Sequence, residues 1–241
     1  MKQTELTGFV ISRKNINDAD KIVGIFTREL GKQSFIAKGI RKPQAKLQSQ
    51  IEPLVESKYR ILGNGKLPAL VGAKGLTKNE FYGKSVDINV AGLLLTEIVE
   101  KFSVEGMPNE AAYKSYRDGL ENISRGDKTR LIITYFVLQL MKAFGIEPHI
   151  ESGHNKFWLD IENGTINGLG GNDSLSINAD TVKLWNACIK YDISTVVRLK
   201  IGTKTLVDSL NMLLTYVQYH SERKIKSTKV LSESTNLLQA G

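Results

Sequence analysis

The hydrophobic pattern of this chain changes near residue 80, and that change requires a fold that joins a β module to a helical module. Before it, short apolar runs alternate with polar residues between turn signals, which is typical of strands. The five runs are FVIS at 9–12, KIVGIFT at 21–27, QSFIA at 33–37, VESKYRI at 55–61 and LPALVGAKGL at 67–76. Residues 1–80 are therefore predicted to form a small β-barrel or sandwich.

Residues 81–241 follow a helical pattern. Three polar residues are placed to cap helices, namely Asp87 before GLLLTEIVEKF, Asn109 before EAAYKSYRDGLENI and Asp127 before TRLIITYFVLQLMKAF. The third helix is apolar on nearly every face, so we expect it to be buried at the centre. Further helices are predicted at about 179–190, 194–199 and 203–221. The fold class is thus α+β, with a mostly helical second domain.

An irregular insert, at about 149–178, interrupts the helices. Within it KFWLDIENGTINGL is typical of a hairpin that turns at Glu162–Gly164. His149 and His154 are five residues apart, but no Cys or carboxylate completes a metal-binding set. The one cysteine, Cys188, has no partner for a disulfide and is expected to be a small buried residue. The sequence therefore predicts no metal and no other cofactor.

The positive charge lies in the first third of the chain. Residues 1–80 hold 15 Lys and Arg against 7 Asp and Glu, whereas residues 81–241 hold 18 of each. This asymmetry indicates either a polyanion-binding module joined to a neutral module, or simply a soluble basic surface. It does not distinguish the two.

The densest cationic stretch is KGIRKPQAK, which has no acid and follows a predicted strand. Long Lys and Arg side chains on a connection between strands can bind the phosphates of a nucleic acid, and the counterions released from it supply affinity. A second basic run, ERKIKSTK, either extends this path or is a solvated helix end. The predicted DNA contacts are Lys38, Arg41, Lys42 and Lys46, with support from Arg13, Lys14, Arg28, Lys32, Arg223, Lys224 and Lys226.

Four aromatic residues lie among these cations. Small barrels that bind single strands stack bases on exposed rings, but at strand spacing most aromatic residues belong to the core. Tyr59, flanked by Lys58 and Arg60, is the best candidate for an exposed ring. Alternation along a strand nevertheless places its two neighbours on the opposite face.

No constellation of catalytic residues is recognisable. KNEFYGKS at 78–85 has Lys78 where a phosphate-binding loop needs glycine. We therefore predict a binding protein and not an enzyme. Two alternatives stay open: a scaffold whose basic face binds acidic protein partners, and a nuclease.

The N-terminus does not resemble a signal peptide and no apolar run is long enough to span a bilayer, so a cytoplasmic location without a membrane partner is expected.

The order of several stretches resembles the RecO family of bacterial recombination mediators. They are TGFVISRKN, DADKIVGIFTRELGK, FIAKGIRKPQAKL, IEPLVESKYRI, GLLLTEIVEKF and, near the end, YVQYHSERKIKSTKVL. The resemblance implies an N-terminal OB-fold, binding of single- and double-stranded DNA, and annealing of complementary strands. It also implies partnership with RecR and with the acidic tail of single-stranded DNA-binding protein (SSB), and help in loading RecA on coated DNA close to the nucleoid.

The insert departs from the family pattern. Many members carry four zinc-binding cysteines there, and this chain has none of them. We therefore expect no zinc, and packing of Phe157 and Trp158 is the hypothesised substitute. Stoichiometric zinc in an elemental analysis of the purified protein would contradict this expectation.

Overall fold

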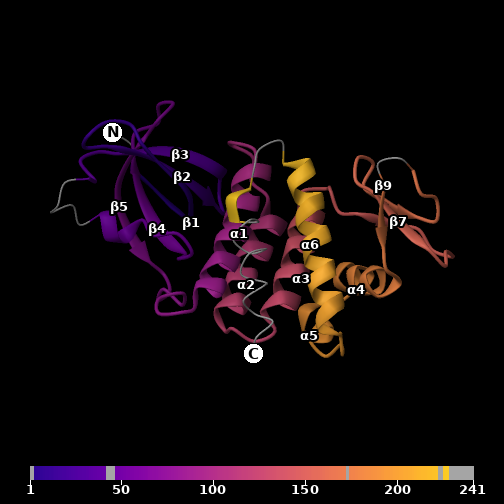
Figure 1. The fold of residues 1–241 in the computed structure, drawn as a ribbon. Coiled ribbons are helices and arrows are strands. Elements are labelled where there is room, and N and C mark those ends of the chain that lie inside the picture. Colours follow the sequence, from indigo (N-terminus) through magenta and orange to yellow (C-terminus); the bar gives the residue numbers. More distant parts are fainter. Residues whose placement is uncertain (1–2, 42–46, 172–173, 222–224, 228–241) are drawn as a thin grey trace.

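The protein folds into three groups of elements arranged in a row. The computed structural model describes residues 3–41, 47–171, 174–221 and 225–227. A β-barrel lies at one end, a bundle of helices lies in the middle, and a small sheet lies at the far end (Figure 1). The predicted α+β class is confirmed.

Five strands between Gln3 and Gly75 form a closed barrel with the strand order β1-β2-β3-β5-β4. Neighbouring strands are antiparallel except β3 and β5, which run parallel. This arrangement is the OB-fold, and all five predicted strands are present. The strands are β1 (Gln3–Asn15), β2 (Lys21–Thr27), β3 (Gly31–Ala37), β4 (Ser57–Leu62) and β5 (Ala69–Gly75), with a short 3-10 helix at Gln48–Gln50.

Alternation along the strands decides which side chains fill the barrel. On β4, Tyr59 is fully buried inside while Lys58 and Arg60 are exposed outside. The expectation that Tyr59 is exposed was therefore wrong. Alternation places Tyr59 on the face opposite Lys58 and Arg60, and closure of the barrel makes the face of Tyr59 the interior. Burial raises the pKa of Tyr59 to about 12.

The outer face of β1 and β2 packs against the helices. Phe9 and Phe26 face each other across these strands and belong to the core of the helical half. Between residues 86 and 220, no helix of the described chain is long and apolar enough to cross a membrane. The helices are α1 (Val86–Phe102), α2 (Glu110–Ser124), α3 (Thr129–Ala143), α4 (Ala179–Lys190), α5 (Ile193–Val196) and α6 (Thr203–His220).

α3 is the buried central helix that its sequence predicts, with ten buried residues. The predicted cap of α2 is confirmed, because the Ala112 N–H donates to Asn109 Oδ1 at 2.9 Å. The other two caps were misplaced. α1 is capped by Ser85, and Asp87 lies in its first turn. α3 follows Lys128, which is in the left-handed region, without a side-chain cap.

The insert is a four-stranded sheet with the order β6-β8-β7-β9. The predicted hairpin is its β7–β8 pair, and the two outer strands, β6 and β9, were not predicted. Leu159 and Ile166 are fully buried, and Phe157 packs against the same core. Among the described residues, no three His, Cys, Asp or Glu side chains cluster as metal ligands. The strands are β6 (His149–Ile150), β7 (Phe157–Asp160), β8 (Thr165–Asn167) and β9 (Ser174–Ile177).

Cys188 is fully buried in α4, as expected from its apolar setting. Desolvation raises the pKa of its thiol from 9.0 to about 12. The folded protein is therefore expected to resist alkylation by iodoacetamide at pH 8, because only the accessible thiolate reacts. The raised pKa also means that this thiol favours folding below pH 9 and that the contribution is lost as the pH rises towards 12. Rapid alkylation in native buffer, followed by mass spectrometry, would contradict the placement.

Candidate nucleic-acid interface

The turn between β1 and β2 organises a basic end of the barrel. Asn17 Oδ1 accepts hydrogen bonds from the N–H groups of Ala19 (2.9 Å) and Asp20 (2.7 Å), which closes the turn. The segment after β3 then packs on it. The Gly39 N–H donates to Asp20 Oδ1 at 2.7 Å, and Arg41 Nη1 donates to the Asn17 carbonyl at 2.7 Å. The start of the basic connection is thereby fixed to this turn.

Strand pairing gathers further cations around the same turn. Lys14 lies opposite Ile22, and Lys21 lies opposite both Asn15 and Ala37. The β4–β5 turn joins them, because the Ile36 N–H donates to the Pro68 carbonyl at 2.9 Å. We name this group the basic rim, and its members are Lys14, Lys21, Lys38, Arg41 and Lys66.

The basic rim is electrostatically available. In the described part of the chain, none of its five cations forms an ion pair with an acidic side chain. Four of them are exposed and Lys21 is half-buried. Uncompensated cations held on turns at one end of an OB barrel are suited to contact the phosphates of a nucleic acid.

Three predicted contacts lie elsewhere. Arg13 pairs with Glu52 at 3.5 Å. Arg28 lies 4.0 Å from Glu110 of α2. Lys32 Nζ donates to the Glu100 carbonyl at 2.6 Å. Arg28 and Lys32 thus face the helical half, away from the basic rim, and their predicted DNA contact has no support from this geometry.

Of the five remaining predicted contacts, the structure describes one, Lys226. Lys226 is exposed on a short segment that returns to α1, where Ile225 is buried and the Ser227 N–H donates to Glu97 Oε2 at 3.0 Å. Lys226 is therefore attached to a helix and not to the barrel. Lys42, Lys46, Arg223 and Lys224 lie outside the described residues.

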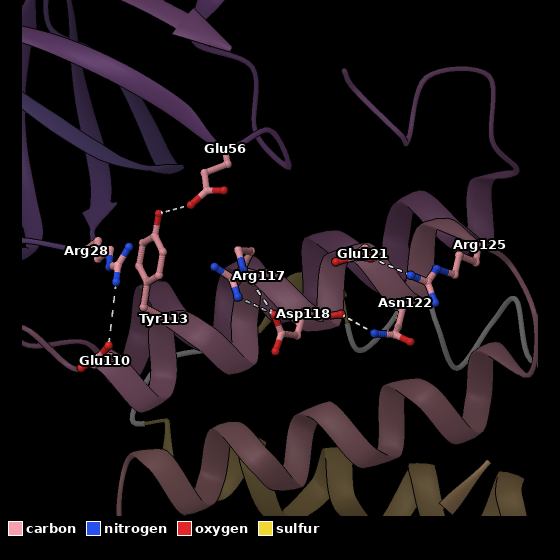
Figure 2. A network of polar contacts seen from close by, with 9 residues as sticks. All are labelled: Arg28, Glu56, Glu110, Tyr113, Arg117, Asp118, Glu121, Asn122 and Arg125. Atoms are coloured by element: carbon pink, nitrogen blue, oxygen red, sulfur yellow. Dashed lines mark hydrogen bonds and ion pairs between the residues drawn. The ribbon is translucent and has the colours of Figure 1, made fainter. Parts of the chain in front are cut away.

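The helical half covers one end of the β2–β3 surface, which is the usual ligand face of OB-folds. The Phe26 and Tyr113 rings lie 5.7 Å apart between their centroids. The Tyr113 hydroxyl donates to Glu56 Oε1 at 2.7 Å and so crosses from α2 to the barrel (Figure 2). Desolvation, and next this bond to Glu56, raises the pKa of Tyr113. The helical half therefore covers the end of the β2–β3 face that lies away from the basic rim.

Beside these contacts, a cleft of about 380 Å³ lies between the barrel and α2. The α2 cations beside it are neutralised on their own helix, with Arg117 at 3.0 Å from Asp118 and Arg125 at 2.6 Å from Glu121 (Figure 2). Because these charges are compensated locally, this face does not continue the positive potential of the basic rim.

In the described part of the barrel, no large aromatic ring is exposed for bases to stack on. Its four large rings are at most 3 % exposed, so the idea that bases stack on them is not supported. The exposed apolar side chains next to the basic rim are Ile16 and Leu67, on the two turns. Sequence reasoning missed Lys66, because the contact of its turn with the end of β3 depends on the parallel pairing of β3 with β5. Gly63 and Gly65, which precede Lys66, predicted a turn but not which strand the turn contacts.

Comparisons with known proteins cover both halves of the chain. The family described as "Recombination protein O N terminal" matches residues 1–78, and "Recombination protein O C terminal" matches residues 85–229. The chain is 22% identical to the DNA repair protein RecO of Desulforamulus reducens, over 96% of this chain and 94% of the relative. It is 24% identical to that of Exiguobacterium sibiricum (95% and 96% covered). It is 29% identical to that of Alkaliphilus metalliredigens (90% and 93% covered).

Proposed function

Since the chain belongs to the recombination protein O family, we propose that it is a DNA-binding recombination mediator that works by binding and not by catalysis. The family name and the curated relatives place it in DNA repair and recombination. The observation that carries the molecular part of the proposal is the basic rim, where five cations without an acidic partner among the described residues lie on or beside two turns of an OB barrel.

The proposed contact is with the sugar–phosphate backbone. Cations without exposed rings bind phosphates and release counterions without reading base sequence. Both single- and double-stranded DNA present such phosphates, so both are proposed ligands. Binding of this kind also lowers the repulsion between two complementary strands, which is the physical requirement for annealing.

The wider role follows the family. We propose that the protein anneals complementary strands and, with RecR, helps RecA load on DNA coated by SSB, close to the nucleoid in the cytoplasm. In this role the helical half receives protein partners, among them the acidic tail of SSB, while the barrel holds the DNA.

The double variant Lys38→Ala/Arg41→Ala tests the DNA contact. Each lost phosphate contact on a single strand lowers the salt slope of log K by about 0.7 and so weakens binding at 0.1 M salt roughly fivefold. The double variant is therefore expected to bind an oligonucleotide roughly ten- to thirtyfold more weakly, with a slope lower by about 1.4. Fluorescence anisotropy titrations at several salt concentrations provide the measurement.

The matched control is Lys200→Ala/Lys204→Ala, which removes the same charge from exposed positions in the helical half. It should leave the salt slope unchanged. A strand-annealing assay with and without SSB then tests the wider role. Unchanged affinity and slope in the Lys38/Arg41 variant would contradict DNA binding at the basic rim, and binding of an acidic peptide but not of DNA would favour a protein scaffold.

A further inference from the structure

The β4–β5 hairpin is a cationic element in its own right. Residues 57–79 contain five Lys and Arg and no Asp or Glu. The turn of this hairpin supplies Lys66 to the basic rim. Its two strands carry cations beyond that point, and none of these has a role in the interface described above.

The strand cations lie on one outer face. Lys58 and Lys74 are directly opposite each other across the two strands, and both are exposed. Like charges in directly opposed positions destabilise a sheet. Such a pair lowers the stability of the free barrel, and the cost disappears when an anion binds between the two ammonium groups.

Arg60 extends the same face. It lies opposite Gly72, where an added Cβ would come within 2.7 Å of Arg60 Nη2. The glycine therefore allows the guanidinium to lie flat across β5. A guanidinium in this position directs its N–H donors along the surface of the sheet, where the oxygens of a phosphate lying against the strands can accept them.

Little acidic charge opposes this face. Within the described residues, the one ion pair made by these strand cations is Lys58 to Glu5, at 3.8 Å. Both partners are about half-exposed, so solvent weakens the attraction. Arg60 and Lys74 form no ion pair in the same part of the chain.

The alternative route for a ligand is closed. A backbone that passes the basic rim and follows β2–β3 meets the helical half, because the Gly106 N–H donates to the Lys32 carbonyl at 3.0 Å. Gly31 lies against the Met107 backbone there. The β4–β5 face starts at the same rim, at Lys66, and lies on strands that follow β3 around the barrel.

We propose that the outer face of β4–β5, formed by Lys58, Arg60 and Lys74, is a second phosphate-contact surface, so that a nucleic-acid strand held at the basic rim continues along this hairpin instead of along β2–β3. The inference rests on the proposed function and specifies its path. It predicts that the footprint of the barrel extends from Lys66 down the hairpin.

The test compares a short and a long single strand, of about 6 and about 16 nucleotides, which spans the range of OB-fold site sizes. The triple variant Lys58→Ala/Arg60→Ala/Lys74→Ala is expected to bind the long strand at least tenfold more weakly, with a salt slope lower by about 2. It should bind the short strand almost as the parent does, because the basic rim suffices for it. The Lys38→Ala/Arg41→Ala variant should lose affinity for both.

A single substitution separates loss of contact from loss of fold. Lys74→Glu replaces the repulsive cross-strand pair with an attractive one, so the melting temperature is expected to rise by about 1–4 °C. The same variant should bind the long strand more weakly. A protein that is more stable and yet binds less cannot owe its defect to misfolding.

The outcomes are distinguishable. If the hairpin variants bind both strands normally while the Lys38→Ala/Arg41→Ala variant is impaired, the hairpin path is wrong and the proposed function stands. If neither set affects binding, both fail. The Lys200→Ala/Lys204→Ala control tests for an effect of net charge. If it loses as much affinity for the long strand per removed charge as the hairpin variants do, the effect is one of net charge and the proposal is overturned.

Discussion

Replacement of Phe26 by alanine is expected to lower the free energy of unfolding by about 3–5 kcal/mol, which is the usual cost of deleting a buried phenylalanine ring. Phe26 is fully buried, and its ring packs between the barrel and Tyr113 of α2. Phe26 is a residue of a barrel strand, but its ring belongs to the core of the helical half. Loss of the ring should therefore destabilise the barrel and the helical half. Hydrogen exchange followed by mass spectrometry should show weaker protection in peptides of β2 and in peptides of α2.

Phe35→Ala is the matched control. Phe35 is also a buried phenylalanine of a barrel strand, but it belongs to the interior core of the barrel. Its replacement should cost a similar free energy and reduce protection in the barrel strands first. If Phe26→Ala leaves exchange in α2 unchanged, then this ring does not couple the two halves.

Replacement of Gly31 by alanine is the second large effect, with an expected loss of more than about 3 kcal/mol in the free energy of unfolding. Two costs add at this position. Its φ of +68° is in the left-handed region, which costs an L-residue about 1–2 kcal/mol. In addition, a Cβ would lie 2.2 Å from the Met107 carbonyl oxygen, and a backbone atom cannot move aside as a flexible side chain does.

Two other glycines separate these costs. Gly145 has a φ of +74° with open space around it, so Gly145→Ala should carry the conformational cost alone, about 1–2 kcal/mol. Gly65 has open space and no left-handed φ, so Gly65→Ala should be neutral or slightly stabilising. Urea unfolding of the three variants gives the comparison. Equal losses for Gly31→Ala and Gly145→Ala would show that the contact with residues 107–108 does not constrain the junction.

Part of the candidate site follows from the sequence. The concentration of charge before residue 80 and the acid-free stretch from Lys38 identified the barrel as the cationic half, and the structure fixes the start of that stretch on the β1–β2 turn. Arg28 and Lys32 carry the same charge in the same half, yet they face the helices. Sequence gives the sign of a charge and its neighbours along the chain, but the direction of a side chain depends on which element packs against its strand.

Tyr59 is a second residue whose side-chain direction the sequence did not determine. Its cationic neighbours suggested an exposed ring, whereas period-two alternation required only that Tyr59 and its neighbours take opposite faces. The sequence alone did not say which face is inside. Closure of the barrel decided it, because the side with Tyr59 became the interior and the side with Lys58 and Arg60 became the surface.

By itself the sequence determined the local structure of this protein: five strands followed by helices, a buried central helix, a hairpin in the insert, and a basic first third. These properties depend on periodicity, turn residues and composition, which are local along the chain. The tertiary structure alone decided that Lys66 joins the basic rim, that one end of β2–β3 is closed, and that Lys58 lies opposite Lys74. The first two depend on the packing of elements that are distant in sequence. The third depends on the register of the β4–β5 hairpin, which shifts at an irregularity between Arg60 and Ile61 and therefore does not follow from the alternation of the two strands alone.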